Sequence, residues 1–316
     1  MLSYDLGVEM SLRNGEPRCL SLAGAFCFLG QGMRDGQSPI IIHLRYIGFT
    51  LLLIACPARA EFQIQEAGIE KGEIELEYRG AYHRGVPEVT NANPNANDLI
   101  QSHELEFSMG INDWWLIQVT GGFDQPLHED LQANSVEVES EFTLLKREGN
   151  GVAVSFQFGY EQAINHGEQV DGEPNEFAFG PIVEFAKGKF LLTLNPLFTR
   201  QIGTFADQEG LGFDYGWRGE YDVTKRWGVG VEMFGEIEDL ANAGPFNSQV
   251  HSVGPALFYK FGGEDEANGG NDEGNAHEKK VGQPPALAYS MNVGVQFGLT
   301  DATSDTALKF QGSLSF

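Results

Sequence analysis

The residues best suited to chemistry in this 316-residue chain are glutamates that recur at every second position. Successive side chains of a β-strand point to opposite faces, so carboxylates with this spacing gather on one face. A surface of many carboxylates attracts cations and repels anions. Eight glutamates in three short segments are therefore expected to form one continuous acidic wall: Glu73, Glu75, Glu77, Glu104, Glu106, Glu137, Glu139 and Glu141.

Few basic residues share the face that carries these acids. The alternation places fifteen acidic side chains there against four basic ones, which are Arg79, Arg218, Lys260 and Lys309. Four bases cannot neutralise fifteen acids, so some carboxylates must be hydrated, protonated or neutralised by cations. Arg218 and Lys260 are expected to lie across the enclosed space from the acidic wall. The pattern favours a water-filled, cation-preferring interior, and the alternative is a solvated but functionally closed one.

Other candidate chemistry is weak. Ser102 and His103 are adjacent, but neighbours on a strand face opposite ways and cannot form a catalytic dyad directly. The acids and glycines between Glu264 and Glu278 match neither an EF-hand nor a repeated calcium-binding pattern. We therefore expect no catalytic residue, no metal site and no cofactor, and we do not expect an enzyme.

Twelve alternating segments separated by turn residues must position the acidic wall. Most have ten to twelve residues, close to the roughly 9–11 with which a tilted strand crosses a bilayer. We predict an all-β fold, a membrane-spanning antiparallel up-and-down β-barrel of about twelve strands. The expected strands are 73–83, 99–110, 114–123, 134–145, 152–162, 176–185, 189–200, 211–221, 227–237, 250–260, 286–297 and 307–316.

The last segment has the clearest alternation, with apolar residues such as Leu308, Phe310 and Leu314 on one face. It ends the sequence on Phe316 and resembles the signal by which bacterial outer-membrane barrels are recognised for insertion. That resemblance implies the barrel-assembly machinery as a partner, with Phe316 as the insertion signal.

The connections between the expected strands alternate between short and long. Such barrels place short turns in the periplasm and long loops outside. Residues 261–285 break the rule, because this long segment falls on the periplasmic side by strand parity. Its Gly, Asp, Glu and Asn content predicts a disordered acidic insertion.

The amino-terminal part of the chain predicts export. Residues 47–55 form an apolar run that fits a secretory signal peptide, and a small-x-small pattern places cleavage after Ala60. We interpret residues 1–60 as an extension plus signal peptide, with the true start near Met33. Residues 61–316 then form the barrel.

A lipobox-like alternative would leave a lipidated Cys56 as the first residue. All three cysteines precede residue 61, so the expected mature segment has no disulfide or thiolate metal site. Residues 1–60 hold five basic and four acidic residues, which leaves 15 basic against 41 acidic residues in the rest. This balance argues against binding to nucleic acid.

Three stretches carry a family resemblance: GINDWWLIQVTGGFD, DVTKRWGVGVEMFGEIED and SMNVGVQFGLTDATSDTALKFQGSLSF. They resemble uncharacterised proteobacterial outer-membrane barrels grouped with transporters assigned to the MetA pathway of phenol degradation. The resemblance implies a bacterial outer-membrane barrel with a role in small-molecule passage. It covers turns and strands and transfers no site residues. The acidic segment 261–285 departs from the family's compact pattern, which leaves a partner-binding role open there.

These observations favour a passive outer-membrane channel or transporter for small solutes with an acidic, cation-preferring lumen. Its expected partners are outer-membrane lipid, lipopolysaccharide and small solutes. The alternative is a non-conducting structural or surface-recognition barrel that acts through its loops.

Overall fold

The computed structural model describes residues 62–316 except for 69, 91–92, 94–95, 148, 165–172, 207–208 and 263–286. The predicted residues 1–60, with the cleavage position at Ala60 and Cys56, lie outside the described residues. So does nearly all of the predicted insertion at 261–285. Phe261 and Gly262 are an exception, because they belong to the tenth strand.

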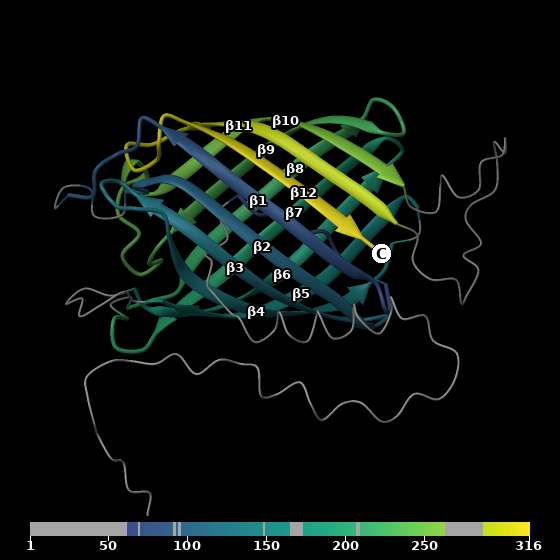
Figure 1. Ribbon diagram of the computed structural model, residues 1–316, viewed down its shortest axis with the longest axis horizontal. Coiled ribbons are helices and arrows are strands. Elements are labelled where there is room, and N and C mark those ends of the chain that lie inside the picture. Colours follow the sequence, from purple (N-terminus) through teal and green to yellow (C-terminus); the bar gives the residue numbers. More distant parts are fainter. Residues whose placement is uncertain are drawn as a thin grey trace, which may run out of the picture. The chain divides into compact units, whose positions relative to one another are not determined.

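The described residues contain twelve strands that close into one antiparallel barrel, in which each strand pairs with its neighbours in sequence and the last pairs with the first (Figure 1). The predicted fold class is therefore confirmed. The strands are β1 (Ile74–Arg84), β2 (Leu99–Asn112), β3 (Trp115–Pro126), β4 (Gln132–Leu145), β5 (Gly151–Ala163), β6 (Asn175–Lys187), β7 (Phe190–Ile202), β8 (Gly212–Asp222), β9 (Trp227–Ile237), β10 (Val250–Gly262), β11 (Ala288–Gly298) and β12 (Thr306–Ser315).

The barrel closes where the first strand meets the last. β1 and β12 pair in an unbroken register from Glu75↔Ser315 to Arg84↔Thr306. Beyond β12, Phe316 exchanges two backbone hydrogen bonds of 2.9 Å with Ile74. Closure leaves no strand edge with unpaired backbone groups, which is the condition for a sheet to exist inside a lipid bilayer.

Alternation along the strands separates an apolar exterior from a polar interior. Leu105 and Val138 are 49% and 47% exposed, whereas the neighbouring Glu104 and Glu139 are 3% and 6% exposed. An apolar outer face is what lipid requires, because a Lys or Arg at mid-depth costs roughly 2–4 kcal/mol. The fold is thus a transmembrane barrel. No helix in the described part of the chain is long and apolar enough to cross a bilayer.

The two ends of the barrel differ in the length of their connections. Strand direction places the turns 113–114, 146–150, 188–189 and 223–226 at the end where β1 begins, here called the turn end. The opposite loop end carries the connections that follow β1, β3, β5, β7, β9 and β11, most of which are longer. β10 finishes and β11 starts at the turn end, which is the side that strand parity predicts for the long connection between them.

A carboxylate holds two connections of the loop end together. Asp239 accepts hydrogen bonds from the backbone N–H groups of Glu209 (3.0 Å), Gly210 (3.0 Å) and Ala241 (2.8 Å). Loss of hydration raises the pKa of Asp239, but these hydrogen bonds outweigh it and hold the pKa below its usual range. The two loops are therefore joined most firmly when Asp239 is ionised.

We expect acid to release this contact. Because the pKa of Asp239 is lower in the folded than in the unfolded protein, ionisation of Asp239 stabilises the fold. This stabilisation is complete at pH values above the pKa of an unfolded aspartate, about 3.9. The stabilisation is lost as the pH falls through the lowered pKa of Asp239. The protection factors of the Gly210 and Ala241 amides, which compare their hydrogen exchange with the intrinsic rate at the same pH, should therefore fall at acid pH. In Asp239→Asn the exchange should be fast already at neutral pH, and equal protection in the two proteins at neutral pH would contradict the prediction.

Candidate functional site

A short segment that precedes β1 lies inside the barrel. This lumenal segment, residues 62–68, contacts strands on several sides of the interior. Its Gln65 N–H donates to Asn195 Oδ1 (2.6 Å), and the Asn195 side-chain amide donates back to the Gln65 carbonyl (3.1 Å). Ile64 is almost fully buried. A glycine, Gly216, gives the segment room, because a Cβ there would lie 3.0 Å from the Gln63 carbonyl.

The lumenal segment donates hydrogen bonds to carboxylates of β2, β4 and β6. Backbone and side-chain amides both take part, which satisfies acids that the sequence alone would leave to water or ions. The contacts are Gln63 Nε2 to Glu106 Oε2 (3.2 Å), Gln65 Nε2 to Glu139 Oε1 (2.8 Å), Ala67 N to Glu184 Oε1 (3.0 Å) and Gly68 N to Glu141 Oε1 (2.6 Å).

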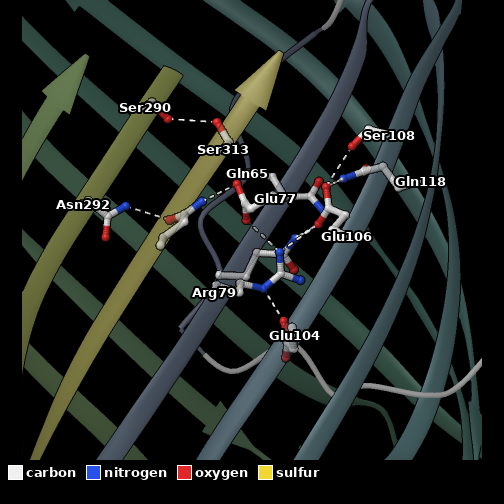
Figure 2. Close-up of polar contacts among 12 residues, drawn as sticks. Gln65, Glu77, Arg79, Glu104, Glu106, Ser108, Gln118, Ser290, Asn292 and Ser313 are labelled. Atoms are coloured by element: carbon white, nitrogen blue, oxygen red, sulfur yellow. Dashed lines mark hydrogen bonds and ion pairs between the residues drawn. The ribbon is translucent and has the colours of Figure 1, made fainter. Parts of the chain in front are cut away.

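Arg79 gathers the carboxylates of β1 and β2. Its guanidinium lies 2.9 Å from Glu77 Oε1 and 2.8 Å from Glu106 Oε2, and it also pairs with Glu104 (Figure 2). The four side chains are buried. Gln118 donates to the second oxygen of Glu106 (2.6 Å), as Figure 2 also shows. Three of the eight predicted wall carboxylates therefore share one base.

The remaining lumen bases also lie against acids. Lys260 Nζ is 2.8 Å from Glu220, and Lys309 Nζ is 2.6 Å from Glu232. Arg218 pairs with Glu66 of the lumenal segment. Arg218 and Lys260 were predicted as charges that oppose the wall. In the structure each of them forms an ion pair with an acid next to it in space.

Two cavities lie on either side of the lumenal segment. The loop-side cavity has a volume of about 520 Å³ and reaches Asp98, Gln249 and Thr303 near the loop end. The turn-side cavity has a volume of about 390 Å³ and reaches Gly262 and Ser315 near the turn end. Gln63 and Gln65 line both cavities, so the segment forms the partition between them.

The eight glutamates of the predicted acidic wall lie in different surroundings in the structure. Five of its members, Glu73, Glu75, Glu77, Glu106 and Glu141, line the turn-side cavity. Glu137 lines the loop-side cavity, Glu104 pairs with Arg79, and Glu139 accepts from Gln65. The wall is thus divided by the lumenal segment and by Arg79.

Sequence reasoning missed the lumenal segment. Residues 62–68 precede the first alternating run and contain no turn signal, so they read as a leader to β1. One clue was present in Gln63, Gln65 and Glu66, three polar side chains in a short stretch otherwise made of apolar and small residues. Their partners come from distant strands, which local patterning does not reveal.

The class that fold and site define is a closed twelve-stranded transmembrane β-barrel whose interior holds a short peptide segment. No family model and no curated protein sequence matches the chain, so its resemblance to the MetA-pathway transporters stays a prediction.

Among solved structures, the chain is similar to an outer membrane channel from Pseudomonas putida F1 at 8% identity, with 82% of this chain and 99% of that one covered and a TM-score of 0.48. The NanC porin (11% identity, 76% and 98% covered, TM-score 0.42) is also similar. So is the KdgM porin in complex with disordered oligogalacturonate (10% identity, 77% and 98% covered, TM-score 0.41).

Proposed function

We propose that this barrel is an outer-membrane channel that passes small solutes and prefers cations. The observation that supports the proposal is a pair of cavities lined by carboxylates on the two sides of one short segment. Low-dielectric walls focus the field of such carboxylates and raise the local concentration of cations. Displacement or rearrangement of residues 62–68 would connect the two cavities that this segment separates.

The proposal also assigns a location and partners. The apolar exterior would contact outer-membrane lipid and lipopolysaccharide, with short turns facing the periplasm. β12 and Phe316 would be read by the barrel-assembly machinery, and a signal peptide ending at Ala60 would direct export. Small solutes are the proposed cargo.

A second candidate is a non-conducting barrel that acts through its loops. The observation that favours it is the lumenal segment itself, which separates the two cavities and is held by the hydrogen bonds that it donates to several strands. Purified full-length protein in planar bilayers distinguishes the candidates. Cation-selective conductance supports the channel. If the protein does not conduct, or if it conducts anions better than cations, the channel proposal is rejected.

Neutralising three consecutive inward carboxylates should weaken the cation preference. We expect Glu137→Gln, Glu139→Gln and Glu141→Gln together to lower the cation-to-anion permeability ratio several-fold, because they remove three negative charges from one strand of the lumen. The reversal potential under a salt gradient measures this ratio directly.

The matched control removes the same number of charges outside the barrel. Glu88, Asp113 and Asp301 are exposed residues of the connections, and their amide variants should leave the reversal potential unchanged. If the lumen variant and this control behave alike, the permeating ions do not sense the carboxylates of β4.

A further inference from the structure

The loop-side cavity differs from the turn-side cavity in its charge. Ten of its described lining residues are Asp or Glu, and none of them is Lys or Arg. The turn-side cavity also contains carboxylates, but Arg218 and Lys260 line it as well, and Arg218 pairs there with Glu66. The two halves of the lumen are therefore suited to different ligands, and the loop-side half is suited to positively charged ones.

Register places several of the loop-side carboxylates directly opposite one another. Glu137 of β4 faces Glu161 of β5, and Glu161 in turn faces Glu176 of β6. Asp214 of β8 faces Glu236 of β9 in the same way. The Cβ atoms of directly opposed residues are about 4.5–5.5 Å apart, so the first three residues form a row of acids at regular intervals.

A neutral group in the cavity wall provides an independent indication of a ligand. Gln157 of β5 lines the loop-side cavity and is 3% exposed, and its Oε1 accepts no hydrogen bond. A buried acceptor without a donor costs about 1–3 kcal/mol relative to a satisfied one. A ligand that brings N–H donors into the cavity satisfies this atom.

The floor of the loop-side cavity is aromatic. Phe62 of the lumenal segment packs edge-on against Phe234 at 5.1 Å and stacks on His83 at 5.6 Å between ring centroids. Phe62, Phe234 and His83 all line the cavity. Aromatic faces accept methylene groups by apolar contact and ammonium groups by cation–π attraction.

A metal ion fits this arrangement poorly. The described residues contain no group of three or more His, Cys, Asp or Glu placed to hold one. The acids are spread along the wall in register, which suits a ligand whose charges are also spread out. An extended organic cation meets the row of carboxylates, the Gln157 acceptor and the aromatic floor together.

We propose that the loop-side cavity binds linear aliphatic polyamines. Their ammonium groups, separated by short methylene chains, lie along Glu137, Glu161 and Glu176, and one of their N–H groups donates to Gln157 Oε1. Their methylene groups contact Phe62 and Phe234. This inference names the solute class of the proposed channel and therefore deepens the proposed function.

Spermidine is the probe that tests the site. Calorimetric titration of the full-length protein in detergent should show saturable binding that weakens as salt is added, because the attraction between charges is screened. Butylamine, which has one ammonium group, should bind at least about tenfold more weakly than spermidine. The loss of a single charged hydrogen bond is enough to cause a roughly tenfold loss of affinity. A neutral diol of the length of spermidine should not bind, and Mg²⁺ at the concentration of spermidine should not displace it.

Two sets of variants localise the binding. Glu137→Gln, Glu161→Gln and Glu176→Gln together should weaken spermidine binding at least about tenfold. Gln157→Leu should weaken it several-fold. Glu73→Gln with Glu75→Gln removes two charges from the turn-side cavity, and this control variant should bind spermidine as the intact protein does. Heat-modifiable migration in gels verifies that each variant folds as a barrel.

The outcomes separate this inference from the proposed function. Unchanged spermidine binding in the folded Glu137, Glu161 and Glu176 variant overturns the inference, and so does displacement of spermidine by equimolar Mg²⁺. Cation-selective conductance without spermidine binding overturns the inference and leaves the channel proposal intact. Spermidine binding that depends on Gln157 and the three glutamates, without any conductance, supports the site and rejects the channel.

Discussion

Deletion of residues 62–68 is expected to raise the single-channel conductance several-fold. The segment forms the partition between the loop-side and turn-side cavities, because Gln63 and Gln65 line both. Its removal joins two cavities of about 520 and 390 Å³ into one continuous lumen. It also removes the hydrogen bonds that the segment donates to Glu106, Glu139, Glu141 and Glu184. Single-channel recording of the deletion variant beside the intact protein measures the effect.

A disulfide between the segment and the wall provides the control. The Asn195 side chain contacts both the N–H and the carbonyl of Gln65, so positions 65 and 195 are neighbours, and cysteines at both positions are used to tie the segment to β7. Residues 61–316 contain no cysteine, so Gln65→Cys with Asn195→Cys creates the only pair there. The oxidised protein should conduct no better than the intact one, and Asn195→Cys alone should not respond to a reductant.

Two results would contradict the role of the segment as a partition. One is a deletion variant with the conductance of the intact protein. The other is an oxidised disulfide variant that conducts as well as the deletion variant, because a segment held at Asn195 cannot then be in the path of the ions.

Replacement of Arg79 by methionine is expected to lower the free energy of unfolding by roughly 3–5 kcal/mol, the cost of leaving buried charges without a partner. Arg79 pairs with Glu77, Glu104 and Glu106, and all four side chains are buried (Figure 2). Methionine fills similar space but leaves three carboxylates close together without a cation. Urea-induced unfolding in lipid vesicles, followed by tryptophan fluorescence, measures the loss.

Removing carboxylates from the Arg79→Met variant tests whether their unpaired charges cause the loss of stability. Glu104→Gln and Glu106→Gln remove two of the three uncompensated charges, so adding them to Arg79→Met should restore a large part of the lost stability. Arg84→Met, at the exposed end of the same strand, should change the free energy of unfolding by no more than about 0.5 kcal/mol. If Arg79→Met is as mild as Arg84→Met, the cluster does not contribute to stability through its charges.

Much of the fold follows from local patterning. The strand predicted over 227–237 is β9, Trp227–Ile237, and the other predicted strands match observed ones to within three residues at each end. Apolar and polar residues must alternate wherever one face of a strand meets lipid and the other meets the lumen, so the period is visible in each segment. Irregular pairing accounts for part of the end differences: β3 runs to Pro126 beyond a register shift between Gly121 and Phe123.

The contacts inside the barrel are decided by the tertiary structure. Glutamates at alternate positions determine that carboxylates face inward, and the excess of acid over base determines that the four inward bases cannot neutralise all of them. Which acids meet which partners is decided by barrel closure, because the groups come from distant positions. Arg218 meets Glu66 across 152 residues, and Gln65 meets Asn195 across 130. The path of residues 62–68 through the lumen follows from such long-range hydrogen bonds, and alternation within a strand carries no information about them.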